Sequence, residues 1–151
     1  MQSPHSPDVV AERDRRVRIW RAATESGPID RLSPERLREL RAFRGQRGIW
    51  VDVRETRKAT HADIGATVGV LHLGGRYADD LGPDRIKYHY PETKSTGHDV
   101  MEVAATKMSH RLELPVFVIT PGLTGRFRWL RRAVVASWDD SNKIFELRFT
   151  R

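Results

Sequence analysis

The sequence contains no cysteine, which excludes disulfides, thiol nucleophiles and zinc sites built on cysteine. Its six histidines never occur in an H-x-x-x-H or H-E-x-x-H spacing, the spacings that place two imidazoles on one face of a helix. We therefore expect neither a metal site nor another cofactor.

Long apolar runs are also missing. No segment approaches the ~18 apolar residues of a membrane-spanning helix. The first ten residues, MQSPHSPDVV, lack the basic and then apolar layout of a signal peptide. These absences predict a cytoplasmic protein without membrane contact. Phosphate-loop, dinucleotide and G-x-S-x-G motifs are absent as well, which removes the best-known nucleotide-binding and serine-hydrolase classes.

What the chain has in excess is positive charge. There are 27 lysines and arginines against 20 acidic residues, a net charge of +7. Such a balance suits a polyanionic partner, and arginine in particular makes forked contacts to phosphate. A genome rich in G and C would produce the same arginine excess without any function, so charge alone leaves both interpretations open.

Aromatic residues are few, yet all three tyrosines lie between Gly69 and Pro91. The same stretch holds a Gly74-Gly75 pair and the acidic pair Asp79-Asp80. Aromatic faces beside a carboxylate are suited to sandwich a flat polar ring and to accept a hydrogen bond from its edge. The structural alternative is that the tyrosines are half-buried packing residues and that the two aspartates belong to an ordinary turn.

Residue patterning predicts an α+β fold. Asp8 is a candidate cap for a helix that ends near Ser26, and Ser33-Pro34 begins a second helix. Arginines around the first helix suit either an arm along a phosphate backbone or, as we favour, the solvated face of a helix docked through Trp20. We expect an N-terminal helical segment over 1–46 and a body over 47–151.

In the body the apolar period changes to two, which indicates strands. We expect one helix between these strands, capped by Asp99 and running to Leu112. The polar stretch 54–61 is predicted to be a loop. A curled sheet or small β-barrel fits better than a repeated strand–helix–strand fold, because only one helix falls between strands. The apolar segment PVFVIT should be central in the sheet. The expected strands are 49–53, 67–72, 86–90, 115–120, 127–138 and 144–149.

The element Gly74-Gly75-Arg76-Tyr77-Ala78-Asp79-Asp80, with Tyr90 ten residues later, resembles the core of the SRA (YDG) domain, which reads 5-methylcytosine in DNA. Residues 48–120 resemble even more closely the SRA-like, PUA-like N-terminal domains of bacterial HNH restriction endonucleases that attack modified DNA, and the last strands do so only weakly. Arg76 departs from the family order because it lengthens the turn by one residue. The segments that carry the second resemblance are 48–52, 77–80, 88–91, 105–107 and 114–119.

The resemblance implies that a modified cytosine is flipped out of the duplex. Tyr77 and Tyr90 would stack on its faces, with Tyr88 as the alternative second ring, and Asp80 would accept a hydrogen bond from the cytosine amino group. Trp50 would either line this pocket or pack under the N-terminal helices, and Asp79 completes the candidate pocket.

The predicted partner is double-stranded DNA that carries 5-methylcytosine, which the protein would bind without cleaving it. The protein would then be associated with the nucleoid. A separate nuclease is a possible second partner, in restriction–modification. Two alternatives stay open: a PUA-like RNA-binding module, and a metal-dependent nuclease that uses Asp79 and Asp80 with Asp99 or Glu102. Phosphate contacts are expected from basic residues in or beside the predicted loops, namely Arg54, Arg57, Lys58, Arg76, Lys94 and Lys107.

Overall fold

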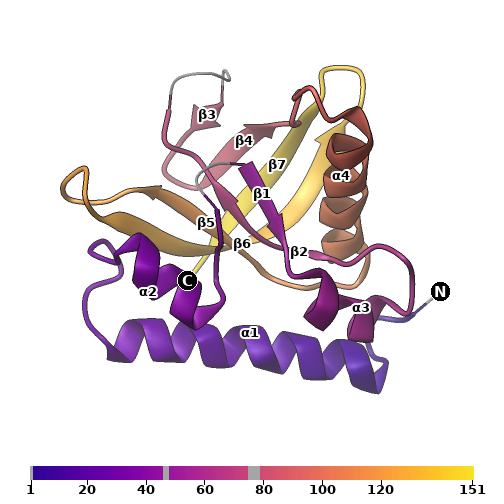
Figure 1. The fold of residues 1–151 in the computed structure, drawn as a ribbon, viewed down its shortest axis with the longest axis horizontal. Coiled ribbons are helices and arrows are strands. Elements are labelled where there is room, and N and C mark those ends of the chain that lie inside the picture. The colour runs from indigo at the N-terminus through magenta and orange to yellow at the C-terminus, as the bar shows by residue number, and fades with distance from the viewer. Residues whose placement is uncertain (1, 46–47, 75–78) are drawn as a thin grey trace.

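A computed structural model describes residues 2–45, 48–74 and 79–151. Within these ranges the chain forms an α+β fold of four helices and one curled sheet of seven strands, in the order β1-β2-β5-β6-β7-β4-β3 (Figure 1). Neighbouring strands run antiparallel, except that β2 and β5 are parallel. In chain order the elements are α1 (Pro7–Glu25), α2 (Pro34–Leu40), β1 (Gly48–Val51), α3 (Val53–Thr60), β2 (Thr67–Leu71), β3 (Asp80–Leu81), β4 (Arg85–His89), α4 (Thr96–Arg111), β5 (Val116–Pro121), β6 (Arg128–Asp139) and β7 (Ile144–Thr150).

The strands follow the patterns read from the sequence. All six expected strands are present, and each begins and ends within two residues of its expected bounds. Strand β3 is a short addition that pairs with β4. The prediction that PVFVIT lies inside the sheet is confirmed, because β5 is flanked by β2 and β6. None of the helices in the described ranges is long and apolar enough to cross a membrane.

Two of the helix starts differ from the expectations, and α2 ends at Leu40 rather than near Gly45. Ser6, rather than Asp8, precedes the first turn of α1, and Asp8 lies within that turn, where a negative charge favours the helix N-terminus. Helix α4 begins at Thr96, three residues before Asp99. The carboxylate of Asp99 instead accepts hydrogen bonds of 2.7 Å from the backbone N–H and the hydroxyl of Thr93, which closes the loop before the helix.

The prediction of a loop over 54–61 is wrong, since all but the last of these residues belong to α3, and His61 is its C-cap. Asp52 caps this helix by accepting from the backbone N–H of Glu55 at 3.4 Å. Its buried face consists of the small residues Thr56, Ala59 and Thr60. These residues recur at the three- and four-residue spacing of a helix face, but the polar composition of the stretch favoured a loop. The fold therefore has two helices between strands of the body, α3 and α4, instead of one.

The two faces of the sheet bury two clusters. The inner cluster lies on the concave face of the sheet, and strands near both edges contribute to it. It includes Ile49, Val70, Val118, Ala133 and Leu147. The outer cluster lies between the opposite face and the N-terminal helices. Its members are Ile19, Ala23, Leu32, Leu37, Leu40, Ala42, Phe43, Val68, Leu71, Phe117, Ile119 and Leu130.

Helix α1 docks against the body along its length, as Figure 1 shows. The Arg16 side chain is fully buried and its Nε donates to Glu12 at 2.7 Å. Its guanidinium also donates to the backbone carbonyls of Thr67 and Pro115, each at 2.8 Å. Of the two interpretations of this arginine-rich helix, the docked helix is the one observed.

Candidate functional site

A cavity of about 290 Å³ opens where the two edges of the curled sheet meet. Strands β1 and β2 form one wall and β4 forms the other, while α4 closes one side. The Tyr88 hydroxyl donates to the carbonyl of Leu71 at 2.9 Å and so ties the walls together. We call this space the seam cavity. It is lined by Gly48, Ile49, Leu71, His72, Leu73, Gly74, Asp79, Tyr88, His89, Pro91, Thr93, His98 and Glu102.

Asp79 supplies the best-fixed acceptor of the seam cavity. The residue directly precedes β3 in the sequence, and its side chain is only 7% exposed. One carboxylate oxygen lies 2.8 Å from Nδ1 of His72, and the other accepts from the backbone N–H of His89 at 2.7 Å. Because an ionised carboxylate only accepts, Nδ1 of His72 carries the proton in this contact. Each oxygen keeps a lone pair, so the carboxylate can still accept from a ligand.

Helix α4 contributes a second carboxyl group to the cavity. Glu102 is buried, and its Oε2 lies 3.2 Å from Nε2 of His98 one turn earlier. Burial raises the pKa of the Glu102 carboxyl, as does the nearby Asp99, while His98 acts in the opposite direction. The cavity thus combines two carboxyl groups with the rings of Tyr88, His72 and His98, a set that can recognise a flat ligand with hydrogen-bond donors on its edge.

The residues singled out in the sequence separate in the structure. Tyr77 and Arg76 lie outside the described residues. Asp79 and Tyr88 line the seam cavity, whereas Asp80 is exposed on β3 opposite Lys87 and does not line it. Successive residues of an extended chain point to opposite sides, so only one aspartate of the pair can face inward.

Tyr90 and Trp50 also lie away from the cavity. The Tyr90 ring packs against Phe145 with centroids 4.4 Å apart, and its hydroxyl donates to Asp140 at 2.8 Å. Burial and that hydrogen bond raise the pKa of the Tyr90 hydroxyl well above its ordinary value. Trp50 packs against the outer cluster, the second of the two positions considered for it.

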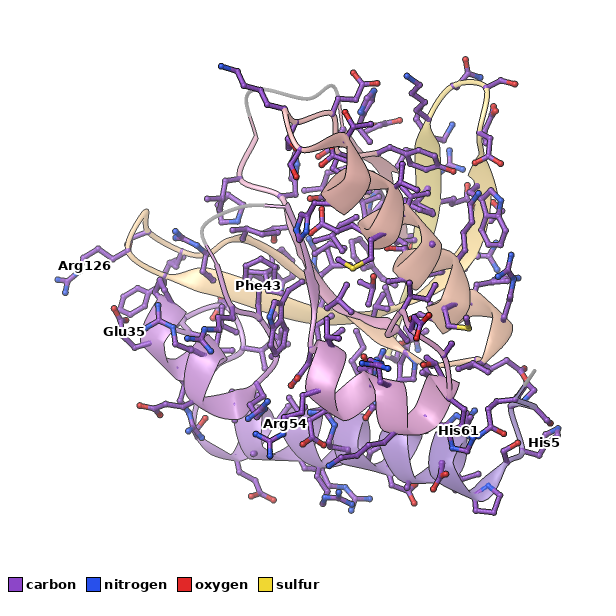
Figure 2. All side chains as sticks on the ribbon, turned by 45° about the vertical axis from the view of Figure 1, so that its right-hand side comes forward. His5, Glu35, Phe43, Arg54, His61 and Arg126 are labelled. Carbon is purple, nitrogen blue, oxygen red and sulfur yellow. The ribbon has the colours of Figure 1, made fainter. Side chains whose placement is uncertain are left out.

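The predicted phosphate-binding residues lie in three places. Arg54, Arg57 and Lys58 belong to α3, which lies beside α1 at the end of the sheet away from β3; Figure 2 labels Arg54 there. Lys94 is exposed in the loop whose Thr93 lines the cavity. Lys107 lies 2.8 Å from Asp140, next to Trp138.

Sequence reasoning did not assign His72 or His98 to the site. His72 directly follows β2, and its period-two spacing from Val70 places it on the inner face. His98 precedes Glu102 by four residues, the spacing at which helix residues are neighbours. Both signals were present, but neither shows which strand lies opposite.

Among the described residues, no group of three or more His, Asp or Glu side chains is arranged to hold a metal ion. Comparison of the chain with models of protein families, with curated proteins and with solved structures finds no significant match. The functional argument therefore depends on the geometry of the seam cavity and on the charge around it.

Proposed function

We propose that this protein binds double-stranded DNA that carries 5-methylcytosine and holds the modified base, flipped out of the duplex, in the seam cavity without cleaving the strand. The observation that carries the proposal is Asp79, a nearly buried carboxylate held by His72 and the His89 backbone at the wall of a cavity with aromatic lining. The SRA-like sequence element around this aspartate points to the same ligand.

The chemistry of cytosine matches this wall. Its exocyclic amino group is a hydrogen-bond donor, which a carboxylate accepts well. The cavity lies at the small end of the ~300–1,000 Å³ range of ligand sites, as expected if one base enters rather than a longer segment. In this proposal Asp79 takes the role that the SRA resemblance implies for Asp80, and Tyr88 is the described tyrosine that contacts the base.

Magnitudes indicate where affinity and selectivity come from. Extruding a base costs a few kcal/mol, and stacking on a ring returns ~1–3 kcal/mol. Burying one methyl group adds only about 0.8 kcal/mol, which corresponds to about fourfold in affinity. Most of the affinity must come from phosphate contacts made by a chain of net charge +7, so binding should weaken steeply as salt rises.

The test compares neighbouring aspartates. Wild-type protein should bind a duplex with one 5-methylcytosine about fourfold more tightly than the unmodified duplex, measured by fluorescence anisotropy. Asp79→Asn keeps the shape of the side chain but removes the charged acceptor. It should abolish the preference and leave the salt-dependent background. Asp80→Asn is the matched control and should behave like wild type, because that side chain is exposed outside the cavity.

Equal affinity of the wild type for both duplexes would overturn the proposal. Stronger competition by structured RNA than by methylated duplex would favour the RNA-binding alternative. Strand breaks on incubation with Mg²⁺ or Mn²⁺ would favour the nuclease alternative.

A further inference from the structure

Arg131, on the inner face of β6, is held between two aromatic rings. Its guanidinium carbon lies 3.8 Å from the centre of the Trp129 ring and 4.1 Å from that of Phe149. Trp129 lies two residues earlier on β6, and Phe149 comes from β7 opposite Ala133. A planar guanidinium between two rings is fixed in orientation, because rotation would break one of the stacking contacts.

The charge of Arg131 has no counter-ion in the described part of the protein. No carboxylate there lies within ion-pair distance of it, and its one hydrogen bond is from Nη2 to the Thr120 hydroxyl at 3.3 Å. Its Nε is buried without a hydrogen-bond partner. Burial lowers the pKa of the guanidinium. The buried Arg16, by contrast, is paired with Glu12 and donates to three backbone carbonyls.

Such an arrangement is costly unless an anion completes it. Rings attract a cation but accept no N–H hydrogen bond of ordinary strength, so the Nη donors that do not bond Thr120 remain available to a planar or tetrahedral oxyanion. Trp129 is 38% exposed, so the stack lies at the surface, where such an anion can reach it.

The stack lies on the same face of the sheet as the seam cavity, and at the same end. Thr120 pairs with Trp129, and the backbone N–H of His72 donates to Ile119 at 2.8 Å. His72 at the end of β2, Thr120 on β5 and Trp129 on β6 therefore lie side by side across three adjacent strands. With neighbouring strands ~4.8 Å apart, about 10 Å separates the stack from the wall that holds His72. Phosphates of one DNA strand follow one another every ~3.4 Å along the axis, so a strand whose base occupies the cavity has phosphates within that distance.

We propose that the Trp129–Arg131–Phe149 stack binds a backbone phosphate of the DNA strand whose base enters the seam cavity. This inference rests on the proposed function for the identity of the ligand. It adds a contact that carries no sequence or methylation information and sets the position of the strand relative to the cavity.

Arg131→Gln and Arg131→Lys test it on methylated and unmodified duplexes over a series of salt concentrations. Arg131→Gln should weaken binding to both duplexes about tenfold and make the negative slope of log K against log salt shallower by about 0.9. The ratio between the two duplexes should not change. Arg131→Lys keeps the charge but loses the planar fork, so it should keep the slope and lose affinity. Arg18→Gln, which removes an exposed charge from α1 on the far face of the sheet, is the matched control and should stay within about twofold of wild type.

The outcomes separate this inference from the proposed function. If Arg131→Gln binds both duplexes as the wild type does, the stack is not a phosphate site, whatever the methyl preference. If the wild type shows no methyl preference and Arg131→Gln still loses tenfold on unmodified DNA, the phosphate site stands and the base-reading proposal fails. A wild type that binds no DNA at low salt overturns both. Thermal unfolding of each variant confirms that it is folded, and Arg131→Lys serves if the glutamine variant is not.

Discussion

At the scale of single residues, Arg16 and Arg131 are both held in place but differ in whether the protein itself supplies a counter-ion. Arg16 is 1% exposed, and Glu12 and three backbone carbonyls account for its charge and its donors. Arg131 is fixed just as firmly by rings but has no anion among the described residues. The first arrangement is complete without a ligand, while the second is not. The same distinction marks Asp79, whose carboxylate is oriented by two donors and still faces a cavity.

Arg16→Met should reduce the free energy of unfolding by about 3–5 kcal/mol. The substitution fills the volume of the side chain but leaves Glu12 buried beside Arg15 alone, and it leaves three carbonyls without their donor. Urea unfolding followed by circular dichroism measures the change. Arg18→Met, at an exposed position of the same helix, should alter stability by less than about 0.5 kcal/mol. Equal effects of the two substitutions would mean that the buried contacts are not what holds α1.

At the scale of elements, β2 positions the site. It pairs with β1 and β5, continues into His72, and lies against the segment that follows α2. A Cβ placed on Gly69 would come 2.5 Å from the carbonyl oxygen of Ala42, so the strand approaches that backbone more closely than any side chain permits. This approach brings Val68 and Leu71 into the outer cluster and holds the end of β2 at the cavity wall.

Gly69→Ala should therefore destabilise the protein by roughly 1–3 kcal/mol, because the added methyl group overpacks a contact with backbone that cannot move aside. The matched control is Gly97→Ala in the first turn of α4, where no atom lies within 4 Å of the added Cβ. That change should be neutral or should stabilise by up to about 1 kcal/mol, through helix propensity. Thermal unfolding of both variants measures the difference. A stable Gly69→Ala protein would show that the 41–43 segment can shift.

At the scale of the whole molecule, the N-terminal segment covers the outer face of the sheet. Residues of α1 and α2 bury Val68, Phe117, Ile119 and Leu130 in one cluster, and Arg16 reaches the backbone of β2. The division into an N-terminal helical segment over 1–46 and a body over 47–151 remains a prediction. The shared cluster gives a physical reason to expect that the body depends on the helices.

We expect residues 47–151 alone to lose cooperative unfolding, because removing the N-terminal segment would expose the apolar face of β2 and β5 to water. Calorimetry of the shortened chain and of the full chain, with an NMR spectrum of each, tests this. A sharp transition near that of the full chain would show instead that 47–151 is an independent domain and that the helices only cover it.

Local patterns determined much of the fold. Period-two alternation and short apolar runs located the six main strands, and Ser33, whose hydroxyl accepts from the Arg36 backbone at 3.0 Å, was recognisable as a helix cap. These features depend on residues close in sequence, so they can be read without the partners. The exception is α3: its buried residues Thr56, Ala59 and Thr60 recur at helical spacing among charged residues, but they are too polar to stand out as an apolar stripe.

Residue patterns alone were enough to assign the α+β class, six of the seven strands, and the stretch around Gly69–Pro91 in which the candidate cavity residues concentrate. The folded chain was needed to show that Asp79 rather than Asp80 faces the cavity, that Tyr88 lines it while Tyr90 packs on Phe145, and that Arg131 stacks beside the site. The physical reason is that the curl of the sheet brings the end of β2 close to β4. These strands are not neighbours in the sheet and are far apart in the sequence. In an extended chain, a shift of one residue in the pairing register turns each side chain to the opposite face of the sheet. The register is set by how the strands pair and not by residue type alone.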